Sequence, residues 1–168
     1  MTRSENVNFP TSMLASDVIR LGALGWSNPA WQAAFYPTDM PAEWQLTYFN
    51  TQFGCVFLEQ SVWLHATPEQ RLQWHADTHE QFVFLLETDG LQPQPVELAG
   101  KARLLKRDDA QILWFTRDSS LKALAAALSS NANNANQAEE VQPRFLVSLD
   151  GDLAQMERVA TLLEVMGL

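Results

Sequence analysis

Short apolar runs alternate with longer amphipathic segments along this chain. Five runs have the length and composition of strands: 18–24, 55–62, 82–87, 112–115 and 145–149. The last three are almost continuously apolar, which is typical of strands covered on both faces, as in a parallel sheet. The pattern therefore predicts an α/β fold with a parallel sheet of about five βα units.

Four helices are predicted around these runs, at 41–53, 67–79, 119–130 and 152–167. Thr67 followed by Gln70 three residues later is close to a capping box, and Pro41 suits the first turn of its helix. The last helix is expected to be capped by Asp150 or Asp152 and to stop at Gly167. In the first helix, an aromatic group falls on one side of the predicted helix: Trp44, Tyr48 and Phe49.

Two segments interrupt the alternation. Residues 88–111 are predicted to form a long connection with one short helical turn, in which the basic run 101–107 is a solvated loop face. The polar, low-complexity residues 131–143 are predicted to be a flexible loop. We expect residues 1–168 to form one domain.

Composition narrows the class of partner. The formal net charge is −9, which argues against nucleic acid as the main partner, because such binding relies on Lys and Arg. The chain has one cysteine, Cys55, so an internal disulfide is excluded. Neither a signal-peptide core nor a membrane-length apolar run is visible, so we expect a soluble cytoplasmic protein that contacts no membrane.

Two neighbouring stretches carry a family resemblance: "LGALGWSNPAWQAAFYP" (21–37) and "EWQLTYFNTQFGCVFLEQS" (43–61). They resemble the widespread bacterial YecE-like family, a family of unknown function. The matching residues are Gly22, Gly25, Trp26, Trp31, Phe35, Tyr36, Pro37, Trp44, Tyr48 and Phe53. The resemblance implies a (β/α) barrel of the TIM type, with the aromatic loop at the C-terminal rim of the first strand.

The resemblance also reveals departures from the family. Phe57 stands in place of a family glutamate, Glu59 in place of an asparagine, Glu87 in place of a lysine, and Ser148 in place of a glutamate. The last helix aligns with the helix after the family's fifth strand, which leaves strands six to eight without a counterpart. We therefore expect an incomplete, TIM-barrel-like sheet, because five units cannot close an eight-stranded barrel.

Candidate chemistry is sparse. Glu59 is a weak candidate for a catalytic carboxylate, with Arg20 or Arg144 as its partner. His75 and His79 share a predicted helix face, but Ala76 stands where the zincin motif needs glutamate, so no metal is expected. Residues 150–152 are interpreted as a turn and helix cap, and no cofactor motif is present.

The aromatic residues allow two interpretations. Trp26, Trp31, Tyr36 and Trp63 are our candidate ligand-binding residues, because aromatic loops at strand ends make good binding walls. In the alternative, the rings of the loop close one end of the sheet as a hydrophobic plug.

The function we expect is that of a non-catalytic, degenerate YecE-like protein acting as a binding or assembly module. The alternative is a hydrolase or lyase that uses Glu59 at the strand rim, so whether the protein is an enzyme stays open. Inner positions such as Phe57 would face an open groove in an incomplete barrel, and we therefore expect a homodimer. The alternatives are a partner protein, or cover from the chain itself by the N-terminal residues with Phe9 and Met13 or by residues 88–111.

Overall fold

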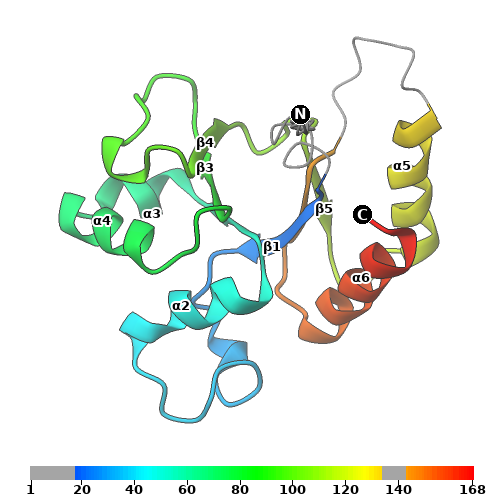
Figure 1. Ribbon diagram of the computed structural model, residues 1–168, viewed down its shortest axis with the longest axis horizontal. Coiled ribbons are helices and arrows are strands. Elements are labelled where there is room, and N and C mark those ends of the chain that lie inside the picture. Colours follow the sequence, from blue (N-terminus) through cyan, green and yellow to red (C-terminus); the bar gives the residue numbers. More distant parts are fainter. Residues whose placement is uncertain (1–17, 134–142) are drawn as a thin grey trace, which may run out of the picture.

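The computed structural model describes residues 18–133 and 143–168. These residues form a six-stranded sheet in which every neighbouring pair of strands is parallel. The strands are β1 (Arg20–Leu24), β2 (Cys55–Leu58), β3 (Val83–Glu87), β4 (Ala102–Leu105), β5 (Ile112–Phe115) and β6 (Phe145–Ser148). The sheet curls into a half-barrel, with helices on its outer side (Figure 1). The predicted α/β, incomplete barrel-like fold is therefore confirmed.

Capping hydrogen bonds and a left-handed glycine mark the ends of several helices. They are α2 (Ala42–Gln52), α3 (Gln60–His65), α4 (Pro68–Ala76), α5 (Leu121–Asn133) and α6 (Leu153–Met166), with short 3-10 turns η1 (Pro29–Trp31) and η2 (Val96–Leu98). Thr67 and Gln70 form the predicted capping box of α4. Asp152 caps α6 by accepting from the amide of Gln155 at 2.9 Å, and Gly167 ends it in the left-handed conformation.

Several predicted boundaries are wrong. The run 55–62 stops being a strand at Leu58, and α3 begins at Gln60. The predicted connection 88–111 contains the expected helical turn, η2, but also the strand β4. Helix α5 includes residues 131–133 of the predicted flexible loop 131–143, and residues 134–142 lie outside the described residues.

The order of the strands corrects the expected register with the barrel family. The order is β4-β3-β2-β1-β6-β5, so the last strand lies beside the first. In a closed barrel the last strand also pairs with the first. By position, β5 and β6 therefore stand where the final two strands of a barrel stand, and the break in the sheet falls between β4 and β5.

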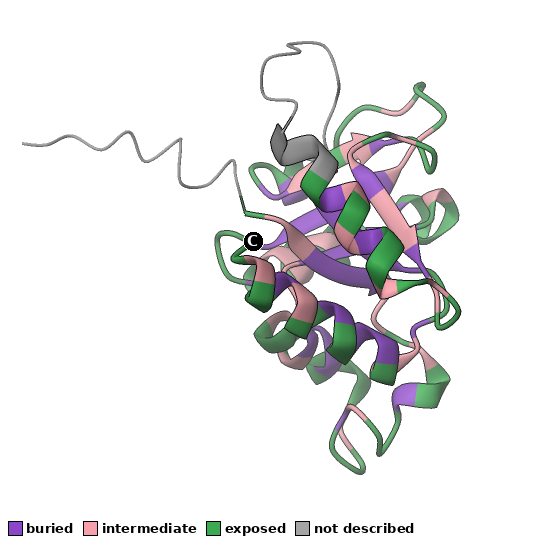
Figure 2. Ribbon diagram, turned by 90° about the vertical axis from the view of Figure 1, so that its right-hand side faces the viewer, coloured by how far each residue is buried: buried purple, intermediate pink, exposed green. Residues whose placement is uncertain are grey.

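The outer face of the sheet carries the larger core. Alternate strand residues, among them Val56, Phe84 and Leu146, pack against buried helix residues such as Phe49 of α2 and Val159 of α6. Figure 2 shows the strands largely buried, and helices whose outward faces are exposed. Within the described residues, no helix has the length and apolar character needed to cross a membrane.

A second core fills the inner face and consists of strand residues alone. Its buried members are Cys55, Phe57, Val83, Leu85, Leu105, Ile112, Phe145 and Val147. Phe57 is 0% exposed. It therefore does not face an open groove, and this expectation is wrong.

The basic run 101–107 supplies part of the cover for that inner core. The guanidinium carbon of Arg103 lies 5.4 Å from the ring centre of Phe145, and that of Arg107 lies 5.6 Å from the ring centre of Phe57. The ring of Trp114 meets Phe57 edge-on, with the centroids 4.9 Å apart. The prediction of a loop is thus wrong for residues 102–105, which form β4, whereas the arginine side chains are exposed to solvent as predicted while they lie over the inner rings.

Candidate functional site

Two glycines, one within β1 and one directly after it, have different structural roles. A Cβ atom on Gly22 would lie 1.9 Å from the carbonyl oxygen of Cys55, so β1 and β2 approach too closely for any side chain at this position. Gly25 has φ +71°, a conformation that turns the chain out of β1 and that other residues rarely adopt. The loop then enters η1, where the Asn28 side chain accepts a hydrogen bond from the amide of Ala30 at 2.9 Å.

Two of the four aromatic side chains of this loop, Trp31 and Tyr36, are buried. Trp31 is 1% exposed, stacks on Phe49 with centroids 5.9 Å apart, and donates from its indole nitrogen to the carbonyl oxygen of Gly151 at 2.7 Å. The Tyr36 hydroxyl donates to the carbonyl oxygen of Trp26, and burial raises the pKa of Tyr36 above its ordinary value. These rings and their polar atoms are engaged within the fold.

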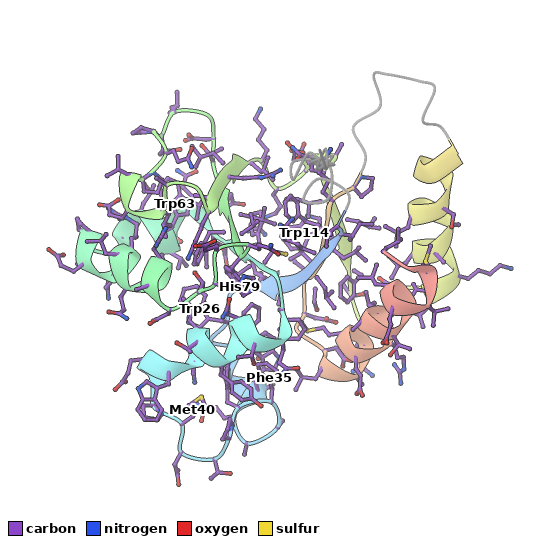
Figure 3. All side chains as sticks on the ribbon, viewed as in Figure 1. Trp26, Phe35, Met40, Trp63, His79 and Trp114 are labelled. Atoms are coloured by element: carbon purple, nitrogen blue, oxygen red, sulfur yellow. The ribbon has the colours of Figure 1, made fainter. Side chains whose placement is uncertain are left out.

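The four candidate ligand-binding residues lie in different surroundings. Trp63 of α3 is buried and donates to the carbonyl oxygen of Glu87 at 2.9 Å. Trp26 is half-buried and packs edge-on against Trp74 at 5.2 Å between centroids. Of Trp26, Trp31, Tyr36 and Trp63, Trp26 is the one that lines a cavity described below. Figure 3 shows Trp26 near α2 and Trp63 apart from it, near α3 and α4.

The carboxyl ends of the strands enclose a cavity of about 420 Å³. It is lined by residues 24–29 after β1, residues 57–59 at the end of β2, Val62 of α3, and Leu149 after β6. We call it the rim cavity. The side chains of Trp26, Asn28 and Glu59 come together here because parallel strands end at the same edge of the sheet.

Arg107 holds two carboxylates at this rim. Its Nε donates to Oε2 of Glu87 at 2.8 Å, and its NH2 group lies 3.6 Å from Oε2 of Glu59. The other oxygen of Glu87 accepts from the amide of Gln60 at 3.2 Å. The expected partners of Glu59, Arg20 and Arg144, are wrong, because both lie at the opposite, amino end of the strands.

A second hollow of about 470 Å³ adjoins the rim cavity at Leu149. Its other lining residues are Arg107, Asp108 and Trp114, and the indole nitrogen of Trp114 donates to the carbonyl oxygen of Arg107 at 2.8 Å. The sequence reasoning missed Arg107, Trp114 and Leu149 as rim residues. The alternation of Arg103, Leu105 and Arg107 was the signal that could have identified a strand facing the inner core.

Residues 150–152 and Cys55 have contacts that belong to the fold and not to a ligand site. Residues 150–152 form the predicted turn and cap: burial raises the pKa of Asp150, but hydrogen bonds from the amides of Arg117 and Asp152 and from Ser148 outweigh it, so the pKa lies below its ordinary value. Cys55 is fully buried, which raises the pKa of its thiol to about 12. Within residues 18–133 and 143–168, no three His, Cys, Asp or Glu residues form a group suited to hold a metal ion.

Comparison with known proteins gives one finding. Residues 20–91 match the sequence model of a family described as "Protein of unknown function DUF72". The resemblance to the YecE-like family is consistent with this match. No curated protein and no solved structure matches the chain.

The DUF72 match covers part of the rim. It runs from β1 through β3, so it includes the aromatic loop, Glu59 and Glu87. Arg107, Trp114 and Leu149 lie beyond it. The residues that neutralise the rim carboxylates and close the inner core therefore come from the part of the chain outside the matched segment.

Proposed function

We propose that this chain is a non-catalytic binding module of the DUF72 type, with the rim cavity as its ligand site. The observation that carries the proposal is the engagement of both rim carboxylates by Arg107. Barrel enzymes place their acids and bases at this edge of the sheet. Here one arginine bridges the two acids, and its guanidinium group is also stacked on Phe57.

The hydrogen bonds and ion pair of Arg107 engage the carboxylate oxygens that acid–base catalysis would need. Both oxygens of Glu87 accept hydrogen bonds, one from Arg107 and one from the backbone of Gln60. A general acid or base must instead exchange a proton with a bound substrate within hydrogen-bond reach. Glu59 is half exposed and pairs with the same arginine, so it supports orientation of a ligand better than proton transfer.

The walls of the rim cavity indicate the kind of ligand. Leu24, Val62 and Leu149 give it an apolar surface, and Trp26 adds an aromatic face. Polar atoms come from Ser27, Asn28 and Glu59. This combination suits a small molecule with an apolar body and a hydrogen-bonding group directed toward Asn28 and Glu59.

Ligand-observed NMR with a set of small amphipathic amines and alcohols tests the binding site. Leu149 is half exposed and lines both hollows, so Leu149→Arg should fill the site without disturbing the core. Val165→Arg, on the exposed face of α6, is the matched control. We expect compounds that bind the wild type and Val165→Arg to lose binding to Leu149→Arg. Equal binding to all three proteins would place the ligand site elsewhere.

The alternative, a hydrolase or lyase using Glu59, predicts a different result. Purified protein is assayed against phosphoesters, glycosides and simple esters, with Glu59→Gln beside the wild type. We expect no turnover that depends on this carboxylate. Turnover by the wild type that Glu59→Gln abolishes would establish the enzyme and overturn the binding-module proposal.

The homodimer was expected because inner positions would face an open groove. The inner face is instead covered from within the chain, so this reason for a dimer no longer applies. What remains are the edge strands β4 and β5, each only four residues long, and short edges limit pairing between chains. Light scattering on dilute protein decides the matter: a monomer has a mass of 18.9 kDa, and twice that mass would confirm the dimer.

A further inference from the structure

Helix α2 exposes a tryptophan and buries a glutamine. Trp44 is 61% exposed, whereas the next residue, Gln45, is 9% exposed. Of the three aromatic residues predicted to share one side, Trp44 and Tyr48 line the same groove, whereas Phe49 is fully buried in the core, so the prediction is wrong for Phe49. Leaving an indole in water forfeits the burial of one of the largest apolar side chains, so an exposed tryptophan on a well-formed helix calls for a partner.

A groove of about 760 Å³ lies along this side of α2. Its apolar wall is formed by Met40, Trp44 and Tyr48, and its opposite wall includes Gln73 and Asp77 at the end of α4. We call it the α2/α4 groove. Figure 3 places Met40 on the side of α2 that is turned away from the sheet, opposite Trp26. The groove shares no lining residue with the rim cavity.

The groove continues inward between the two helices. A smaller hollow of about 210 Å³ shares Glu43, Gln73 and Asp77 with it and ends at Trp26 and Trp74. An occupant would thus find an aromatic platform at the surface and a narrow apolar recess beneath it. This shape suits a side chain inserted from an extended segment.

The charge of the α2/α4 groove is one-sided. Among the residues that the structure describes, the charged ones lining it are Glu43 and Asp77, and none is a lysine or arginine. Within the described residues neither carboxylate takes part in an ion pair, although Oδ1 of Asp77 accepts from the side chain of Gln73 at 2.7 Å. An exposed indole in a groove that two carboxylates also line attracts a cation both through the ring quadrupole and through Coulomb interaction.

We propose that the α2/α4 groove docks a basic segment of a partner protein, with an arginine or lysine over Trp44 and an aliphatic neighbour in the recess. Arginine suits the site best, because its planar guanidinium stacks on an indole while donating to carboxylates. The groove holds only a few residues, so the contact is of the weak, transient class. The evidence for this site comes from α2 and α4 and not from the rim cavity, although Trp26 lines both the recess and that cavity.

The test uses three capped peptides of one length: Leu-Arg-Leu-Arg, Leu-Gln-Leu-Gln and Leu-Glu-Leu-Glu. Each is titrated into ¹⁵N-labelled protein while the indole N–H signal of Trp44 is followed. That signal is assigned by its absence in Trp44→Phe. We expect the arginine peptide to shift the Trp44 signal with saturation, the glutamine peptide to bind more weakly, and the glutamate peptide to leave the signal in place.

Variants separate the platform from the charge. Trp44→Ala should weaken the arginine peptide at least about tenfold, as loss of a central aromatic anchor does. Glu43→Gln combined with Asp77→Asn should weaken it by about threefold and remove its dependence on salt. Val165→Ala, an exposed apolar position on α6, should keep wild-type affinity. Amide spectra of each variant verify the fold.

Three results would overturn the proposal. The first is a Trp44 signal that responds to none of the peptides at millimolar concentration. The second is equal binding of the arginine and glutamate peptides, which would show a merely apolar site. The third is a Trp44 signal that shifts with protein concentration alone, because the groove would then be filled by a second copy of this chain.

Discussion

Trp31 should be the most important aromatic side chain for stability. Its ring is almost fully buried, stacks on Phe49, and contacts Phe35 and Tyr36 at centroid distances of 5.6 and 6.1 Å. Its indole nitrogen joins the loop after β1 to Gly151 in the turn before α6. One side chain thus connects segments 120 residues apart in the sequence.

Two substitutions divide its contribution. Trp31→Ala removes the ring and leaves a cavity, which costs about 3–5 kcal/mol of the free energy of unfolding. Trp31→Phe keeps an aromatic ring but deletes the donor to the buried carbonyl of Gly151, which costs about 1–3 kcal/mol for the unsatisfied group. Trp44→Ala removes an indole that is mostly exposed and should cost less than about 1 kcal/mol.

Urea unfolding followed by far-ultraviolet circular dichroism measures all three changes without relying on tryptophan fluorescence. The urea concentration at the midpoint should be lowered least by Trp44→Ala, more by Trp31→Phe and most by Trp31→Ala, with the slope of the transition unchanged. The reasoning is refuted if Trp31→Ala costs no more than Trp44→Ala. It is refuted in its hydrogen-bond part if Trp31→Phe is as stable as the wild type.

Three further predictions concern Lys101, Glu97 and Cys55. The ammonium group of Lys101 donates at 2.7 Å to two carbonyl oxygens at the end of α4. Lys101→Met removes this group and should lower the free energy of unfolding by about 2–3 kcal/mol. Lys106 is exposed, so Lys106→Met should leave the stability unchanged in the same urea assay. Hydrogen bonds from Arg71 lower the pKa of Glu97, so this carboxylate stabilises the fold above the ordinary carboxyl pKa of about 4.3 and the gain is lost as the pH falls. Glu97→Gln should therefore flatten the loss of thermal stability between neutral and acid pH, and a variant with an unchanged acid limb would contradict the pairing. Cys55 is buried with its pKa raised to about 12, so a thiol reagent such as dithionitrobenzoate should react only after urea is added, and rapid reaction of the native protein would show that the inner core opens.

Local hydrogen bonds are what the sequence by itself determined. The capping box of Thr67 and Gln70 and the Gly167 stop join residues only a few positions apart, so residue type and spacing decide them, and the cap of α6 was narrowed to Asp150 or Asp152. The parallel, incomplete barrel-like sheet was also predictable, since continuous apolar runs separated by helices admit few other arrangements.

Tertiary structure decided which faces those elements present. The segment 101–107 looks like a loop because its arginines are charged, but residues 102–105 pair with β3 as a strand, and Arg103 and Arg107 then lie over Phe145 and Phe57 from other strands. The exposure of Trp44 likewise depends on how α2 packs, and not on the helical pattern that predicted its aromatic side.

Part of the candidate site was also predictable from the sequence, and part depended on the tertiary structure. The sequence identified Glu59 and Trp26 as rim residues through the loop that follows each strand, but it paired Glu59 with the wrong arginines. Arg107 is 48 positions away from Glu59 and 20 from Glu87, and it reaches both because β2, β3 and β4 are neighbours in the sheet. Strand order fixes which distant charges meet. It is set by the packing of the whole sheet, which no local spacing encodes.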